Sequence, residues 1–109
     1  MTNGTVREVA AFEDTVNQDA ALAGPKGHLV RPAYVLANRG DTVKWVNCTN
    51  EGLKLKVNGL HIEEESGAKL DLAIEIPTTA DLGVYDYDLK TSTTNKLFKG
   101  ESKPEIIVR

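Results

Sequence analysis

The side chains that could do chemistry are few and lie far apart in the sequence. The chain has one cysteine, Cys48, and two histidines, His28 and His61. A cysteine nucleophile needs a base within hydrogen-bond reach, and Cys48 has none nearby in the sequence. A metal site would need both histidines to converge with carboxylates such as those of Glu63–Glu65. We therefore predict no catalytic residue, no metal site and no cofactor, and retain a site built from His28, His61 and Glu63–Glu65 as an alternative.

The remaining polar patterns favour solvent-exposed surface. Asp86 and Asp88 alternate with tyrosines, so both should point to the same side of one strand instead of facing each other across a cleft. Asn3 and Asn47 each begin a glycosylation sequon, which matters only in a eukaryotic secretory setting. We expect a protein that is not an enzyme. A small enzyme of unknown class remains an alternative, and it would require a concave pocket containing titratable groups.

Composition points to one globular domain over residues 1–109. The chain is 40% hydrophobic and 27% charged, and its 13 basic and 16 acidic residues give a net charge of −3. The sequence has no stripe of basic and aromatic residues, so we expect no nucleic-acid partner. It also has no run of about 18 apolar residues, so we expect no membrane partner.

The sequence is compatible with more than one cellular compartment. Met1–Glu8 has neither the basic flank nor the apolar stretch of a secretion signal. This pattern fits a protein that remains in the cytoplasm or one whose signal has been removed. The unpaired thiol of Cys48 is more typical of a reducing compartment.

Alternating apolar and polar residues predict about seven short strands. The eight segments that could supply them are Val6–Phe12, Tyr34–Ala37, Val43–Trp45, Leu53–Val57, Leu60–Glu64, Leu70–Ile76, Tyr85–Leu89 and Glu105–Arg109. Many short strands separated by turns are typical of a sandwich or barrel. The segment Glu13–Gly27 could instead form one short helical turn or an ordered loop.

Asn58-Gly59 between two alternating runs predicts a β-hairpin with a two-residue turn. In this register His61 projects with Lys56 and Glu63 on the polar face. The predicted cross-strand pairs are Val57 with Leu60, Leu55 with Ile62, and Lys54 with Glu63.

Three segments, in this order, resemble the cupredoxin family of blue-copper domains. They are Gly40–Asn47, Ile76–Tyr87 and Ile106–Val108, and the resemblance spans Val30–Arg109. It implies an all-β fold, a cupredoxin-like antiparallel Greek-key β-sandwich, and leans toward export from the cytoplasm. Members of the family hold copper with two histidines, a cysteine thiolate and an axial methionine.

This chain departs from the family at each position that the resemblance assigns to a copper ligand. The first histidine falls on Leu53, the cysteine on Leu89, the second histidine on Ser92 and the methionine on Leu97. Leucine has no donor atom, and serine is a poor copper ligand. We therefore expect a copper-free module in which Leu53 and Leu89 belong to an apolar core.

The loop Thr91–Asn95 would replace the copper-binding loop, and loops at the end of a rigid sandwich are common binding surfaces. We expect a binding or structural module whose unknown partner is a protein or a glycan, with self-association through a free sheet edge as a further expectation. The expected contact residues are Thr91, Ser92, Thr93, Thr94, Asn95 and Phe98.

Overall fold

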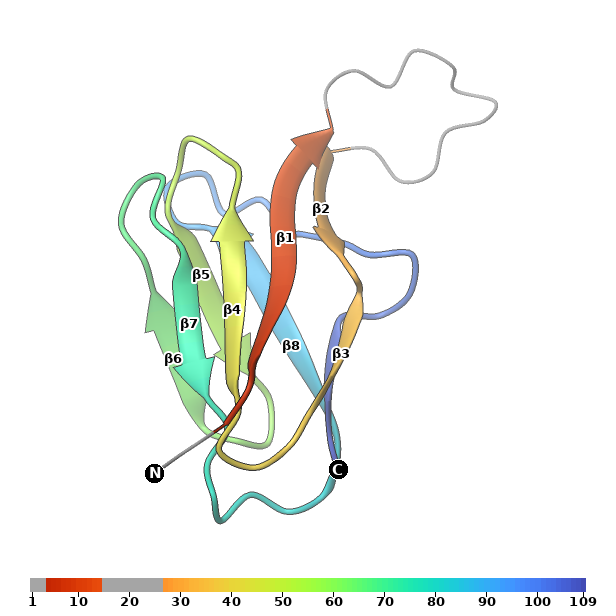
Figure 1. Cartoon of the computed structure of the whole chain (residues 1–109). Coiled ribbons are helices and arrows are strands. Elements are labelled where there is room, and N and C mark those ends of the chain that lie inside the picture. Colours follow the sequence, from red (N-terminus) through yellow and green to blue (C-terminus); the bar gives the residue numbers. More distant parts are fainter. Residues whose placement is uncertain (1–3, 15–26) are drawn as a thin grey trace.

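The computed structural model describes residues 4–14 and 27–109, and this part of the chain forms two β-sheets packed face to face (Figure 1). It contains nine strands and no helix. The strands are β1 (Val6–Asp14), β2 (Gly27–Arg31), β3 (Tyr34–Ala37), β4 (Thr42–Asn47), β5 (Leu53–Val57), β6 (Ile62–Glu65), β7 (Leu72–Glu75), β8 (Gly83–Thr91) and β9 (Glu105–Val108). The expected all-β sandwich is confirmed.

The two sheets are mixed, not purely antiparallel. The four-stranded sheet has the order β2-β1-β4-β7, and the five-stranded sheet has the order β3-β9-β8-β5-β6. Two neighbouring pairs, β1 with β4 and β3 with β9, run parallel, which corrects the expectation of an antiparallel sandwich. Parallel neighbours cannot be joined by a tight hairpin, so local turn signals do not reveal them.

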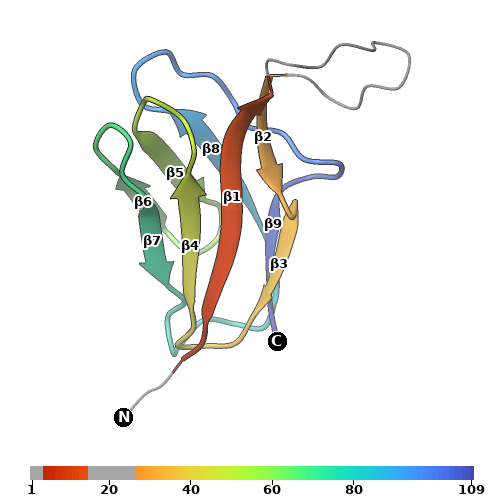
Figure 2. The same ribbon diagram turned by 45° about the horizontal axis from the view of Figure 1, so that its top comes forward.

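Strand β2 was not predicted from the sequence. It is a short strand that ends at Arg31, and Pro32 follows where the chain passes from the four-stranded sheet to β3 in the five-stranded sheet (Figure 2). Proline lacks the N–H that a central strand needs, so this change of sheet coincides with a natural strand end. The helical turn considered for Glu13–Gly27 falls mostly outside the described residues, and its described ends belong to β1 and β2.

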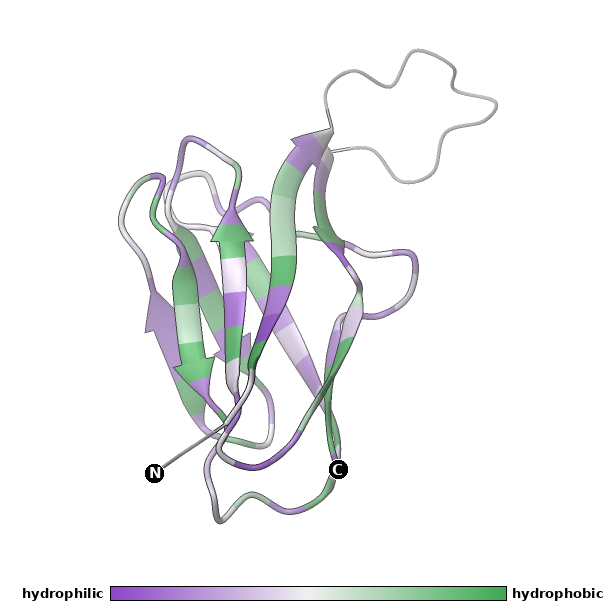
Figure 3. Cartoon of the chain, viewed as in Figure 1, coloured by the Kyte–Doolittle hydropathy of each residue, from purple (hydrophilic) through white to green (hydrophobic). Residues whose placement is uncertain are grey.

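The core lies between the sheets and follows from the alternation of side chains along each strand (Figure 3). Val43 and Trp45 on β4 belong to the same core cluster as Leu55 on β5 and Leu89 on β8, and all four side chains are buried. Leu72, Ile74 and Ile76 are buried, whereas Leu70 precedes β7 and is 61% exposed. Cys48 is exposed.

Two aromatic side chains bridge the sheets at the centre of the core. The rings of Trp45 and Tyr87 meet edge to face with centroids 5.2 Å apart. Neither the indole N–H nor the phenol hydroxyl has a hydrogen-bond partner among the described residues. Burial raises the pKa of Tyr87 to about 12, and the nearby indole of Trp45 offsets part of that shift.

The hairpin of β5 and β6 forms, but its register differs from the prediction. Val57 pairs with Ile62 and Lys56 with Glu63, so the turn contains four residues instead of two. His61 therefore lies in the turn with a φ of 55° and is exposed, not on the face of the strand. The pairing shifts by two residues, which is the side-chain period of a strand, so the residues that remain in β6, Ile62 to Glu64, stay on their predicted faces.

The loops gather at two opposite ends of the sandwich (Figures 1 and 2). At the upper end in Figure 1 lie the β4–β5 loop, the start of β2 and the loop that follows β8. At the lower end lie the β3–β4 turn, the β5–β6 turn and the β7–β8 loop. Among the described residues, no helix is long and apolar enough to cross a membrane.

Candidate functional site

The two strand positions that the resemblance assigns to copper ligands are filled by hydrocarbon. Leu53 begins β5 and is 0% exposed, and Leu89 on β8 is 1% exposed. The ladder between these strands pairs Leu53 with Thr91 and Leu55 with Leu89, so the inward-facing leucines are neighbours. Their predicted membership of the core is confirmed.

The two loop positions assigned to ligands behave differently. Ser92 is half-buried, and its N–H donates to the carbonyl of Gly52 at 3.0 Å. Leu97 is 44% exposed. Ser92 therefore supports the backbone of the neighbouring loop, and Leu97 contributes an apolar patch to the surface.

Gly52 brings the β4–β5 loop close to its neighbours. A Cβ atom at this position would lie 2.2 Å from the carbonyl oxygen of Ser66 and 2.8 Å from Oγ of Ser92. Such distances leave no room for a side chain, so glycine is required for this approach. The tight packing holds the preceding residue, Glu51, beside the loop that follows β8.

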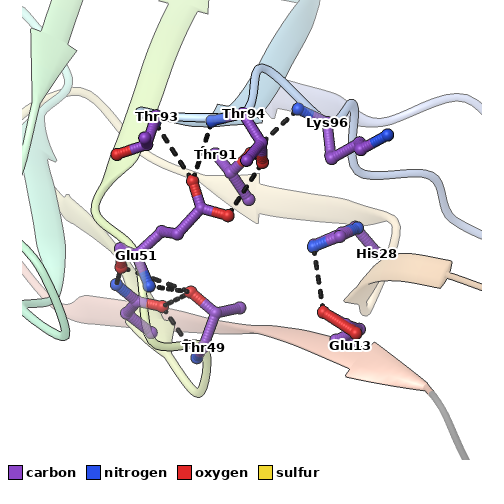
Figure 4. A network of polar contacts seen from close by, with 9 residues as sticks. Glu13, His28, Thr49, Glu51, Thr91, Thr93, Thr94 and Lys96 are labelled. Carbon is purple, nitrogen blue, oxygen red and sulfur yellow. Dashed lines mark hydrogen bonds and ion pairs between the residues drawn. The ribbon is translucent and has the colours of Figure 1, made fainter.

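The carboxylate of Glu51 binds that loop directly (Figure 4). Its Oε1 accepts hydrogen bonds from the N–H groups of Thr93 at 3.1 Å and Thr94 at 2.9 Å. Its Oε2 accepts a third hydrogen bond from the hydroxyl of Thr94 at 2.8 Å. The hydrogen bonds from Thr94, backbone first, hold the pKa of Glu51 below its ordinary value of 4.5, and Thr93 and His28 contribute in the same direction.

The segment Thr91–Lys96, which we name the threonine loop, is also closed upon itself. The hydroxyl of Thr91 accepts a hydrogen bond from the N–H of Lys96 at 2.8 Å and lies 2.8 Å from the hydroxyl of Thr94. The N–H of Asn95 donates to the carbonyl of Thr91 at 3.0 Å. The threonine loop therefore has a fixed backbone and is fastened to the β4–β5 loop through Glu51.

Asn47 and Thr49 fix the other side of the β4–β5 loop. The side-chain amide of Asn47 donates to the carbonyls of Glu51 at 2.6 Å and Leu70 at 3.1 Å. Its Oδ1 accepts from the N–H of Thr49 at 2.9 Å and from the Thr49 hydroxyl at 2.7 Å. The amide nitrogen that a glycan would occupy in the sequon at Asn47 is thus engaged within the fold, while Asn3 lies outside the described residues.

His28 lies at the same end of the sandwich (Figure 4). Its Nε2 is 3.3 Å from a carboxylate oxygen of Glu13, and its ring meets Phe98 edge to face at 5.2 Å. His61 lies in the β5–β6 turn, at the opposite end of the molecule. In the part of the chain that the structure describes, no three His, Cys, Asp or Glu side chains are grouped closely enough to hold a metal ion.

Some of the residues expected to contact a partner are exposed to solvent, and others are buried. Thr93, Thr94 and Asn95 are exposed, and Ser92 is half-buried. Thr91 is 0% exposed and Phe98 is 1% exposed, so neither can contact a partner directly. The expectation for these two residues is corrected because Thr91 continues the inward-facing positions of β8 and Phe98 packs beneath His28.

The features considered for enzymatic chemistry do not converge among the described residues. Asp86 and Asp88 point outward from β8, as predicted, and Asp86 pairs with Lys103 at 2.7 Å. This hydrogen bond to Asp86 raises the pKa of Lys103. Titratable groups do line a hollow of about 480 Å³ on the outer face of the five-stranded sheet, but acids there alternate with Lys54, Lys56 and Lys90.

Sequence reasoning missed Glu51. No local pattern identifies it, because its acceptor role depends on donors that lie 42 and 43 residues further along the chain. The one available signal is its position directly before Gly52-Leu53, where the resemblance locates the first ligand. A single acidic residue before a glycine is too common to stand out in one sequence.

No model of a known protein family matches this chain, and no curated protein matches it either. Among solved structures, the chain is similar to pseudoazurin from Methylobacterium extorquens AM1, with a TM-score of 0.54 and 15% sequence identity. The match covers 94% of this chain and 74% of the pseudoazurin chain. Because pseudoazurin is a cupredoxin and the likeness extends over both sheets, the chain has a cupredoxin-like β-sandwich fold.

Proposed function

We propose that this chain is a non-enzymatic, copper-free binding module that presents the threonine loop to a partner. The observation that carries the proposal is the clamp between Glu51 and the threonine loop, with three hydrogen bonds of 2.8 to 3.1 Å. In the family that the sequence resembles, copper links the start of the equivalent strand to the equivalent loop. Here a carboxylate makes this link, and Leu53 and Leu89 occupy the interior.

A fixed loop is suited to recognition because little conformational entropy is lost when its backbone is already ordered. Thr93, Thr94 and Asn95 are exposed on it and offer hydroxyl and amide groups for hydrogen bonds. The exposed side chain of Leu97 adds an apolar contact beside them. We propose the exposed positions, and not Thr91 or Phe98, as the contact residues.

A protein partner is favoured over a glycan. Phe98, the aromatic residue nearest to the threonine loop in the sequence, is 1% exposed and offers no flat face for a sugar ring. Leu97, by contrast, is 44% exposed, and a mixture of hydroxyl groups with an aliphatic side chain is typical of protein contacts.

The copper-free part of the proposal is tested by elemental analysis of protein purified without chelator. The protein is then titrated with Cu(II) and Cu(I), and a thiolate-to-copper absorption band is sought. We expect no stoichiometric copper and no band. Stoichiometric copper would contradict the proposal, and loss of that copper in a His28→Ala or Cys48→Ser variant would identify the ligands.

The binding part is tested by photo-crosslinking in cells that produce the protein. A benzophenone amino acid replaces Thr93 in the threonine loop or, as a matched control, exposed Thr78 at the opposite end. We expect a discrete protein adduct at position 93 that is absent at position 78 and weakened by Glu51→Ala. Equal labelling at both positions, no adduct at either, or binding to a glycan array in place of a protein would contradict the proposal.

A further inference from the structure

Four strands lie at the edges of the two sheets, and they are protected to different degrees. The outer side of β2 is covered, because Val30 and His28 exchange backbone hydrogen bonds of 2.9 Å with Lys99. Strand β6 reads Ile-Glu-Glu-Glu, and β7 ends in Glu75. Charged residues on an edge discourage pairing with another strand. Strand β3, Tyr-Val-Leu-Ala, carries no charge, so it is the edge among the described strands with the least protection.

The backbone of β3 has hydrogen-bonding groups directed away from its own sheet. Its parallel ladder with β9 uses alternate residues, as the bonds from Glu105 to Ala33 at 3.2 Å and from Arg109 to Ala37 at 3.0 Å define. Val35 lies between Ala33 and Ala37, and its backbone groups point toward β9 as theirs do. The N–H and C=O groups of Tyr34 and Leu36 therefore point to the open side of the strand.

The open side of β3 borders a groove of about 540 Å³ shared with the first half of β1, and the charged residues Arg7, Glu8 and Arg109 also line this groove. Tyr34 is 51% exposed, and Val6 across the groove is 55% exposed. On the outer face, Leu36 continues a cross-strand row with Ile107 and Val84. The edge thus combines free backbone groups with apolar side chains, a combination that favours addition of a strand.

We propose that β3 pairs antiparallel with β3 of a second copy of this chain. A two-fold axis at Val35 places Tyr34 opposite Leu36 of the second copy and Leu36 opposite its Tyr34. Both are positions whose N–H and C=O groups point outward, so each pair makes two backbone hydrogen bonds. The side chains form Tyr–Leu pairs on the outer face, and β3 itself brings no charged residue to the contact.

A second copy is favoured over a foreign peptide because the edge is complementary to itself. Tyr34 and Leu36 of the two copies supply every donor and every acceptor, as an isologous two-fold interface requires. The two five-stranded sheets become one continuous sheet across the interface. The proposal does not depend on the threonine loop, which lies at the upper end of the sandwich.

The oligomeric state is measured by sedimentation velocity over a concentration series up to about 1 mM. We expect a reversible dimer that Tyr34→Lys weakens by about tenfold or more, because a charge enters each edge pair. Tyr34 is half exposed, so the substitution should leave the fold intact, and Leu36→Lys is a second variant with the same purpose. The matched control is Val84→Lys, which alters an equally exposed residue on β8, two strands in from the edge.

Hydrogen exchange supplies a readout at the level of single residues. The amides of Tyr34 and Leu36 should exchange more slowly as the protein concentration rises, and this protection should be lost in Tyr34→Lys. A monomer at every concentration, or a dimer unaffected by both lysine variants, would overturn the proposal. A dimer weakened equally by Val84→Lys would locate the contact on the sheet face and would also overturn edge pairing.

Discussion

Glu51 shows how one carboxylate can organise the end of a β-sandwich. It accepts two backbone N–H groups and one hydroxyl from the threonine loop, and its own carbonyl accepts the side-chain amide of Asn47. Hydrogen bonds to an ionised acceptor are stronger than those between neutral groups. The conformation of the threonine loop should therefore depend on the charge of this single residue.

The variant Glu51→Gln tests this dependence. Glutamine is similar in shape but neutral, and its amide nitrogen cannot accept the hydrogen bond from the Thr94 hydroxyl. We expect the Thr93 and Thr94 amides to exchange with solvent about fivefold faster, as followed by NMR. Glu64→Gln, on the exposed edge strand β6, should leave both amides unchanged.

The same clamp has a pH dependence whose direction is fixed by the lowered pKa of Glu51. The carboxylate form holds the loop, so the clamp is complete above the ordinary value of 4.5 and is lost as the pH falls through the lower pKa of the folded state. The chemical shift of the Thr94 amide should titrate with a midpoint below 4.5. A midpoint at or above 4.5 would show that the clamp is absent in solution.

At the scale of elements, the alternation of apolar and polar residues correctly predicted which side chains of a strand are buried. It did not predict which residues of neighbouring strands pair. The alternation in Leu53–Val57 correctly assigned each side chain of β5 to the core or to solvent. The two-residue turn at Asn58-Gly59 was wrong, because the N–H of Asn58 donates to the carbonyl of Asp86 at 2.9 Å on the neighbouring β8. This third strand holds Asn58 in line with β5 and delays the turn, and nothing local to the hairpin reveals it.

Gly59 occupies a left-handed position in the turn that results. Its φ is 92°, and a Cβ atom there would lie 3.0 Å from the ring of Tyr85. We expect Gly59→Ala to lower the free energy of unfolding by about 1 to 2 kcal/mol in urea denaturation. Gly67→Ala is the control, because its Cβ atom would meet only the flexible side chain of Leu70 at 3.3 Å. Equal losses in the two variants would contradict this account of the turn.

At the scale of the whole molecule, the sequence predicted the fold and its buried core better than it predicted the candidate site around Glu51. Three short segments in the right order resembled cupredoxins, and the sandwich agrees with that resemblance. The burial of Leu53 and Leu89 followed from the same reasoning. The contacts of Glu51 with Thr93 and Thr94, and of Asp41 with Thr5 and Arg7, could not be predicted, because each joins residues more than thirty positions apart.

Asp41 performs at the lower end of the sandwich the task that Glu51 performs at the upper end. It is 3% exposed, and its carboxylate accepts hydrogen bonds from the N–H groups of Thr5 and Asn38, each at 2.8 Å, and from Arg7 at 3.3 Å. Burial by itself would raise the pKa of Asp41. The three hydrogen bonds and the charge of Arg7 outweigh burial and hold that pKa below the ordinary value of 3.8.

Stability should therefore depend on Asp41 in a pH window that the direction of its shift defines. Because the folded-state pKa is lowered, the stabilisation is complete above about pH 3.8 and is lost as the pH falls through the folded pKa. We expect Asp41→Asn to lower the free energy of unfolding at pH 7 by about 2 to 3 kcal/mol, since charged hydrogen bonds at a buried position are lost. Urea unfolding at a series of pH values should show this difference shrinking below pH 3.8, whereas Asp81→Asn, at an exposed position, should change little at any pH. A difference between wild type and Asp41→Asn that stays constant down to the acid transition would mean that the carboxylate does not join β1 to the β3–β4 turn in solution.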